Sequence, residues 1–445
     1  MRIFGTALLS ITISLTVITN VFSQENTLTY EEAVKIALRQ NITLQQQQNL
    51  LKVTEASRTQ SYASFLPNVS AYLGANRIIG RQFDQTVGDF TSEQVDNISG
   101  EISAFLPIFN GFNRLHTMKQ AESAVEQQYY QIARSKQDAI FNASMQYLTV
   151  IVNRELLEVA QANLEFQEEL LRSIEVFLET GTRNIADLYN QEAETKRIAL
   201  TVVEAENQLN ISKAELIRIL QVNPMVEWTF EPPEMEFAEL LTEEVDIETV
   251  YNEAVANRPD YKQQKEQIEI DQRGIKIAKS DYYPSLGIGY SYGSRFSSLA
   301  PETFDEQFRD INRVQVYGIQ LSVPIFSNLR TRASVQRSLQ LYNNSQLALE
   351  DLERSIFTEM QTAIANFKAA QQRVIFADAQ LKAAEKALEV ERERFRLGTG
   401  TLIDLNRANA TFVQARSEDI QADYTLVFQK TALDYYKGVL QTDIE

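Results

Sequence analysis

The chain has 445 residues, of which 44% are hydrophobic and 23% charged, so it has the composition of a folded protein. Its formal net charge of −18 argues against a nucleic-acid-binding surface, which needs Lys and Arg to displace counterions from phosphates. With no Cys and one His, it cannot form disulfides, thiolate metal sites or His-rich metal centres. We therefore expect no catalytic residue, no cofactor and no bound metal.

The first 23 residues have the pattern of a secretory signal peptide. Met1 and Arg2 supply a short positive start, and an apolar run with interspersed Ser and Thr follows from Ile3 to Val21. The alternative is an uncleaved anchor helix, but the run barely reaches the ~20 residues that a span requires. We predict cleavage near Ser23 and export from the cytoplasm. Because no later apolar run approaches that length, the mature chain could enter a membrane only as strands of a closed barrel.

An internal duplication with a constant offset of 217 positions is the strongest signal in the sequence. The Pro-Ile-Phe sequence at 107–109 returns at 324–326, and the Gly-Thr pair at 181–182 returns at 398–399. The repeat is far longer than the ~20–50 residues of a solenoid module. The chain is therefore expected to consist of two large, equivalent halves.

The duplication defines the domain organisation that we predict. Residues 1–23 form the signal peptide, 24–221 the first repeat and 246–445 the second repeat. Residues 222–245 contain three prolines and a cluster of Glu, which indicates an extended linker. Each repeat is expected to contain helices, two strands and a long helical hairpin, in that order.

The expected strands lie at about 68–109 and 285–326, where apolar and polar or small residues alternate. Val69, Ala71 and Leu73 are one such apolar set. A barrel with lipid outside and water inside needs this pattern, but a soluble antiparallel sheet with one face on a core shows it too. Aromatic residues gather near the strand ends, as in an interfacial girdle: Phe65, Phe109, Phe112, Tyr282, Tyr283, Phe296 and Phe326.

Two long stretches without Pro or Gly favour the barrel. The stretch from Phe112 to Leu178 would form a helix ~100 Å long at 1.5 Å rise per residue, and 329–397 repeats the feature. Their apolar positions form narrow seams, which are typical of coiled coils and helical tubes. Four strands cannot close a barrel, for which ~8 is the smallest number, so the chain is expected to oligomerise.

These features together resemble the TolC-like outer-membrane efflux protein family over nearly the whole mature chain. The two Pro-Ile-Phe strand ends, the two Gly-Thr hairpins and the opening helix within Leu28–Asn41 carry the resemblance. The stretch 396–405 is very like the second hairpin of the family. The resemblance implies an internally duplicated α+β membrane protein, with long antiparallel helices in a periplasmic α-barrel and four strands per chain in a trimeric transmembrane β-barrel.

The resemblance also implies a function and partners. A homotrimer in outer-membrane lipid, extending into the periplasm, would act as the passive exit duct of a tripartite efflux system. It would receive small molecules from an inner-membrane pump through a periplasmic adaptor protein, and would itself be no enzyme. One alternative is the exit duct of a type I protein secretion system, since the pump selects the cargo. An alternative from another class is a periplasmic coiled-coil adaptor or scaffold.

The hairpin tips are the candidate functional site. Gly181 and Gly398 can end a helix in the left-handed conformation, and Asp187 and Asp404 then fall in the first turns of the returning helices, where the helix dipole favours an acid. That local role is sufficient to explain both acids. By resemblance, the tips form the periplasmic entrance and contact the adaptor, through Gly181, Thr182, Asp187, Leu188, Gly398, Thr399, Asp404 and Leu405.

Asp404 has a second role by resemblance. Acids near this point ring the aperture in some relatives, and Asp404 matches such a position. Arg407, one turn further on, departs from a double ring of acids, and Phe395 lacks a hydroxyl that could tie neighbouring hairpins together.

Overall fold

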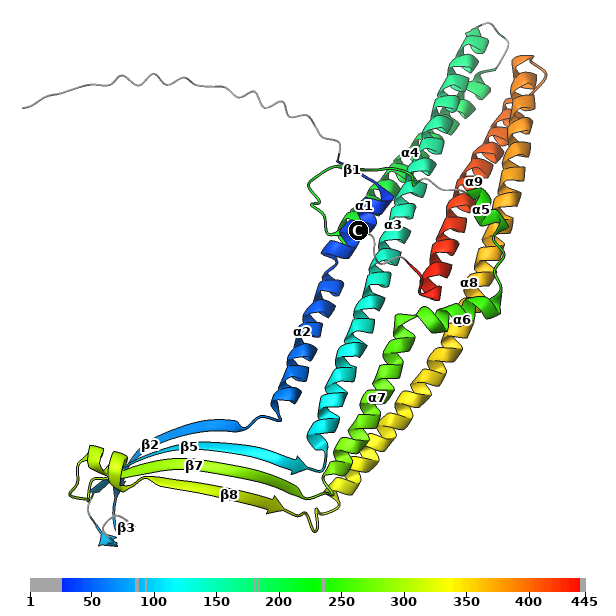
Figure 1. Ribbon diagram of the computed structural model, residues 1–445. Helices are drawn as coiled ribbons and strands as arrows, with labels where there is room; N and C mark the ends of the chain where they lie inside the picture. The colour runs from blue at the N-terminus through cyan, green and yellow to red at the C-terminus, as the bar shows by residue number, and fades with distance from the viewer. Residues whose placement is uncertain are drawn as a thin grey trace, which may run out of the picture.

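The computed structural model describes residues 26–84, 88–92, 94–179, 181, 184–233 and 237–440. The signal peptide predicted at 1–23 lies outside these residues. Long helices run side by side over most of the molecule, and a four-stranded sheet extends from one end of them (Figure 1).

The helices of the two repeats have equivalent bounds. Those of the first repeat are α1 Tyr30–Gln40, α2 Ile42–Ala63, α3 Asn113–Glu179 and α4 Ile185–Leu220. Those of the second are α6 Ile247–Asn257, α7 Pro259–Ser280, α8 Arg330–Arg396 and α9 Leu402–Lys437. Each helix begins and ends 217 positions before its counterpart, as from Asn113 to Arg330.

The two longest helices, α3 and α8, have 67 residues each and span ~100 Å, as the absence of Pro and Gly predicts. Near the sheet, α2, α3, α7 and α8 lie side by side in that order; near the tips, the order is α4, α3, α9 and α8 (Figure 1). At each end, one shorter helix (α7 or α9) therefore lies between the two long ones, and another (α2 or α4) lies on the outer side of α3. None of the helices that the structure describes has an apolar stretch of the length that a membrane crossing requires.

The sheet contains β2 Asn68–Ile79, β5 Gln94–Asn110, β7 Ser285–Ser297 and β8 Val314–Ser322, all antiparallel and in the order β2-β5-β7-β8. The register places Val69, Ala104, Tyr290 and Tyr317 in one row across all four strands. Side chains two residues apart share a face, so the alternating apolar residues of every strand form one continuous apolar face. This face is uncovered in the single chain: Val69 is 65% exposed, Tyr317 75% and Ile319 78%.

The strands end differently at the two Pro-Ile-Phe sequences. In β5 the strand continues through Pro107 to Asn110, with a shift of register between Pro107 and Phe109. In β8 the strand ends at Ser322, so the expected strand residue Val323 lies just beyond it. Proline lacks the N–H that a ladder needs, which accounts for a bulge at one site and a strand end near Pro324 at the other.

Short elements complete the ends of the sheet. A small hairpin, β3 Gln82–Asp84 and β4 Asp89–Thr91, lies between β2 and β5 in the sequence, and a π-helical turn, η1 Glu306–Ile311, lies between β7 and β8. Phe308 of the turn stacks on Phe304, just before it, and Phe304 meets the edge of Phe296 on β7. The predicted aromatic residue Phe296 thus belongs to a cluster with two aromatics of the segment between β7 and β8.

The linker expected at 222–245 is not simply extended. It contains β6 Trp228–Phe230 and α5 Phe237–Thr242, and β6 pairs in parallel with β1 Asn26–Leu28. Tyr147 of α3, which is fully buried, donates its hydroxyl to the carbonyl oxygens of Leu28 and Glu231, at 2.8 and 2.6 Å. Sequence spacing could not reveal that part of this segment pairs with a strand about 200 residues away.

Candidate functional site

The first helical tip turns between α3 and α4 at Gly181. Its φ is 75°, and its N–H donates to the carbonyl oxygen of Leu178 at 2.9 Å. Glycine adopts this left-handed conformation without the cost that an L side chain incurs. Asn184 caps α4, because its Oδ1 accepts from the backbone N–H of Asp187 at 2.9 Å. The predicted contact residue Thr182 lies outside the described residues.

The second tip turns between α8 and α9 at Gly398, whose φ is 74°. The N–H of Gly398 donates to the carbonyl oxygen of Phe395 at 3.1 Å. Thr399 donates twice to the carbonyl oxygen of Arg394, from its backbone N–H at 2.9 Å and from its Oγ1 at 3.1 Å. Thr399 therefore supplies hydrogen bonds to a carbonyl group at the end of α8. This is a structural role for a residue that is also predicted to contact an adaptor.

Asp404 is held by the cap of its own helix. Thr401 Oγ1 accepts from the backbone N–H of Asp404 at 3.1 Å and donates to its Oδ2 at 2.7 Å. The carboxylate lies in the first turn of α9, where the helix dipole stabilises negative charge. The local capping role is thus visible, and the aperture role of Asp404 stays a prediction.

An apolar cluster, here called the tip cluster, joins the two hairpins behind their turns. It comprises Leu170, Ile174, Leu388, Phe395, Leu402 and Leu405. Leu405 is only 2% exposed, and Leu188 packs against the cluster from α4. The ring of Phe395 meets the ring of Phe177 edge-on, with 6.4 Å between the centroids. An aromatic contact therefore links the hairpins at the residue where sequence reasoning noted a missing hydroxyl.

Two hydrogen bonds between amide side chains also tie the hairpins. Asn409 Nδ2 donates to Asn163 Oδ1 at 2.8 Å, and Asn406 Nδ2 donates to Gln191 Oε1 at 3.1 Å. Asn163 and Asn409 are only 8% and 4% exposed, so breaking their pair would leave buried polar groups unsatisfied. These pairs fix how the two hairpins lie against each other.

Farther from the tips, acidic groups lie between α3 and α9. Tyr424 donates its hydroxyl to Glu155 Oε1 at 2.5 Å. Burial and, to a smaller extent, the negative charge of Asp419 raise the pKa of Asp423 to about 6. The protonation state of Asp423 therefore changes near pH 6.

The structure places the predicted site residues in two groups. Leu188 and Leu405 meet at the tip cluster, whereas Gly181 and Gly398 form turns that belong to separate hairpins. Sequence reasoning missed the residues that join the hairpins, namely Phe177, Asn163, Gln191, Asn406 and Asn409. A polar residue at a seam position of a long helix was the available signal. The described residues contain no group of three or more His, Asp or Glu side chains that could hold a metal ion.

Comparison with known proteins identifies the family. A family model described as outer membrane efflux protein matches the chain twice, over residues 33–221 and 250–439. The pyoverdine export outer membrane protein OpmQ of Pseudomonas aeruginosa is 24% identical over 385 residues, which cover 83% of this chain and 77% of OpmQ. The outer membrane protein TolC of Vibrio cholerae is 23% identical over 385 residues, covering 86% of this chain and 82% of TolC.

Solved structures share the fold. The CmeC outer membrane channel of Campylobacter jejuni superposes with a TM-score of 0.81 at 16% identity, over 93% of this chain and 86% of CmeC. The outer membrane protein VceC of Vibrio cholerae gives a TM-score of 0.78 at 14% identity, over 92% of this chain and 96% of VceC. Because the family model covers most of the chain in two copies, the chain belongs to the outer membrane efflux protein family, which confirms the predicted class of function and the predicted location in the outer membrane.

Proposed function

We propose that this protein is one subunit of a homotrimeric exit duct, in which three sheets close one barrel in the outer membrane. The sheet carries this proposal. Within the described chain, β2 and β8 each pair on one side only, which leaves two unpaired edges. Unpaired edges and an uncovered apolar face are both unfavourable in water, and closure in lipid removes both. Three copies of four strands exceed the ~8 that the smallest barrels need.

The helices support association of the same kind. The outer helices of the single chain, α4 on one side and α8 on the other, expose large apolar side chains. They include Leu200, Val203 and Ile211 on α4, and Leu341, Leu347, Phe376 and Val390 on α8. When α4 of one subunit packs against α8 of the next, these side chains are buried and the helices close into a tube. The hairpin tips then lie at the end of the tube away from the sheet (Figure 1).

The tube is a passive conduit for small molecules in this proposal, and the chain catalyses no reaction. Support comes from the efflux family and from OpmQ, whose name assigns it to pyoverdine export. An inner-membrane pump loads the duct through a periplasmic adaptor, which contacts the tips at Gly181, Thr182, Asp187, Leu188, Gly398, Thr399, Asp404 and Leu405. Gly181, Gly398 and Thr399 are exposed, whereas Leu405 is buried. The adaptor would therefore contact the two glycines and Thr399 first.

A second candidate is the exit duct of a protein secretion system. The alkaline protease secretion protein AprF of Pseudomonas aeruginosa is 20% identical over 364 residues, covering 81% of this chain and 74% of AprF. The two candidates share the duct and differ in cargo. Loss of the gene would sensitise cells to small toxic compounds in the first case, and would retain a polypeptide inside the cell in the second.

The mass of the detergent-extracted protein from a separated outer-membrane fraction tests the duct itself. We expect a trimer in that fraction, with discrete conductance steps when it is inserted into a planar bilayer. A monomer in the periplasmic fraction would contradict the proposal and favour a coiled-coil adaptor or scaffold.

A further inference from the structure

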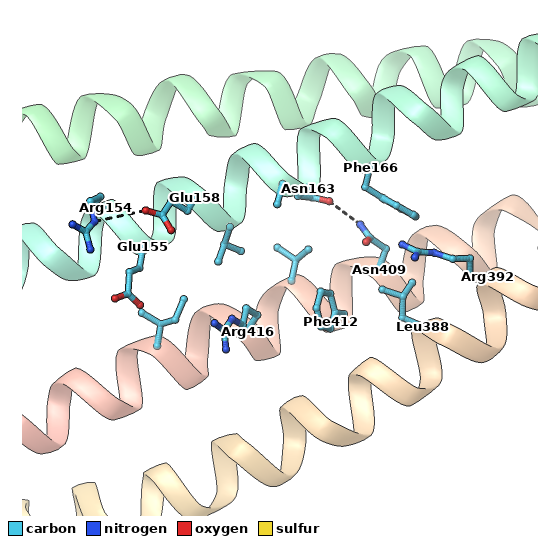
Figure 2. A pocket seen from close by; sticks show the side chains of 14 residues that line it. Arg154, Glu155, Glu158, Asn163, Phe166, Leu388, Arg392, Asn409, Phe412 and Arg416 are labelled. Atoms are coloured by element: carbon cyan, nitrogen blue, oxygen red, sulfur yellow. Dashed lines mark hydrogen bonds and ion pairs between the residues drawn. The ribbon is translucent and has the colours of Figure 1, made fainter. Parts of the chain in front are cut away.

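A pocket of about 520 Å³ opens between the two hairpins, where α3 forms one wall, α9 the other, and α8 closes one end (Figure 2). This volume falls within the range of roughly 300–1,000 Å³ that is usual for small-molecule sites. The pocket lies along the seam that the amide pairs hold together, so an occupant would touch both hairpins at once.

One end of the pocket is apolar and aromatic. Phe166 of α3, Leu388 of α8 and Phe412 of α9 gather there around the side chain of Arg392 (Figure 2). The guanidinium carbon of Arg392 lies 4.9 Å from the centroid of the Phe166 ring. This cation–π contact holds the guanidinium against an apolar wall and leaves its N–H groups, which lie in the plane of the guanidinium, free to donate.

Arg392 differs from the other arginines near the tip of α8. Arg394 and Arg396 pair with Glu391 and Glu393, at 2.6 and 2.8 Å. Across the described chain, no ion pair includes Arg392. In a protein with a net charge of −18, an arginine of this kind, held over an aromatic ring in a pocket, suits an organic anion.

The opposite end of the pocket is charged but internally balanced. Glu155 accepts the hydroxyl of Tyr424, and Glu158 Oε1 lies 3.7 Å from Arg154 Nε. Arg154 Nη1 donates to the carbonyl oxygen of Phe230 at 2.8 Å, but its buried Nε–H has no hydrogen-bond partner. An anionic head group is therefore favoured at Arg392 and disfavoured beside the two glutamates.

We propose that this pocket binds a small amphipathic organic anion. The carboxylate or sulfonate of the ligand pairs with Arg392, and its apolar body lies against Phe166 and Phe412, above the amide pair of Asn163 and Asn409. The inference rests on the fold of the single chain and not on the proposed duct. Since the walls come from both hairpins, bound ligand links them.

Isothermal titration calorimetry with naphthalene-2-sulfonate tests the proposal, with the full-length protein in lipid nanodiscs and empty nanodiscs as the blank. Wild-type protein should bind the sulfonate about tenfold more tightly than neutral 2-naphthylmethanol, because a charge-assisted pair is available only to the anion. Arg392→Gln should weaken sulfonate binding about tenfold and leave the neutral compound unchanged. Arg392→Lys should retain part of the preference.

The matched control is Arg396→Gln, which removes a guanidinium one turn away that does not line the pocket. It should bind the sulfonate as the wild type does. Equal affinity of the wild type for the sulfonate and the neutral compound would overturn the proposal without any variant. Equal losses in Arg392→Gln and Arg396→Gln would overturn it too, because they would show a general charge effect.

Discussion

Asn41 in the first repeat and Arg258 in the second occupy equivalent positions, 217 residues apart. Their side chains nevertheless have different roles, since one caps a helix and the other forms ion pairs. Asn41 caps α2, with its Oδ1 accepting from the N–H of Leu44 at 2.9 Å. Arg258 is 2% exposed and forms ion pairs with Asp260 and Glu359, both at 2.6 Å. The duplication therefore conserves where helices begin and end, while the contacts between helices have diverged.

Helix bounds and inter-helix contacts depend on different residues. Helix bounds depend on local residues, such as the tip glycines at φ of 75° and 74° and the caps Asn184 and Thr401. Inter-helix contacts depend on the neighbouring helices, and these differ between the repeats. Along its length α3 packs against helices of both repeats, whereas α8 packs mainly against second-repeat helices and meets α3 near the tips. Substitutions at equivalent positions should thus have unequal effects where they break contacts, and similar effects where they break turns.

The largest difference is expected at the two helix junctions. Arg258→Gln leaves two carboxylates facing a buried site without their cation, and we expect a loss of about 3–5 kcal/mol in the free energy of unfolding. Asn41→Ala removes one cap and should cost about 1 kcal/mol. Thermal unfolding midpoints of the extracted protein measure both. Similar shifts for the two variants would show that the Arg258 pairs are solvated in solution.

At the tips, Phe395→Ala should loosen the join between the hairpins. Phe395 is 7% exposed and belongs to the tip cluster, and a truncation of this kind costs about 3 kcal/mol. Its equivalent in the first repeat, Leu178, is half-buried and lies outside the cluster, so Leu178→Ala should cost about 1 kcal/mol. Amide hydrogen exchange of 165–180 and 390–410 reports the difference locally. Faster exchange in Leu178→Ala than in Phe395→Ala would contradict the assignment.

The two turn glycines, Gly181 and Gly398, should respond alike to substitution by alanine, whereas Gly400 should be more sensitive. Gly181→Ala and Gly398→Ala each force an L side chain to a φ near 75° with open space around it, and each should cost about 1 kcal/mol. Gly400→Ala adds a methyl group 3.0 Å from the backbone nitrogen of Phe395 and should cost more. The equivalent residue in the first repeat is Arg183, which lies outside the described residues. Melting midpoints rank the three variants, and a milder effect of Gly400→Ala would refute the close packing.

The smallest expected effect is one of pH. Burial raises the pKa of Asp423 to about 6, so ionising this carboxyl destabilises the native protein as pH rises from about 4 through 6. Asp423→Asn should therefore stabilise the protein at pH 7.5, by about 1 kcal/mol or less because the side chain is partly solvated. The gain should shrink as the pH falls through 6 and vanish below about pH 4. The equivalent Glu206 is exposed, so Glu206→Gln is the control and should shift the midpoint at neither pH.

Much of the fold could be predicted from the sequence, because its signals are local or periodic. The 217-residue offset, the absence of Pro and Gly from 112–178, and the alternation in the strands led to the long helices and the sheet. The pairing of β1 with β6 could not be predicted, since two three-residue strands about 200 positions apart carry no periodic signal. The tip turns were predictable from Gly181 and Gly398 for the same local reason.

The joining residues were harder to predict. Asn163 and Asn409 are polar residues at seam positions, and either could have faced solvent as far as the sequence tells. The contact between Phe177 and Phe395 links positions that are not repeat equivalents, so the duplication gave no guide to it. Contacts of this kind depend on how two hairpins are placed, which no single segment encodes.

Cysteine cross-linking across the two sheet edges tests the trimeric barrel most directly, and the absence of native Cys makes it unambiguous. Leu73→Cys on β2 would be combined in turn with a Cys in place of Gln315, Tyr317, Ile319 or Leu321 on β8. Within one chain these edges are three strand spacings of ~4.8 Å apart, too far for a disulfide. Oxidation in the outer membrane should give a covalent trimer for at least one pair. Monomer alone for all four pairs would contradict the closure of three sheets into one barrel.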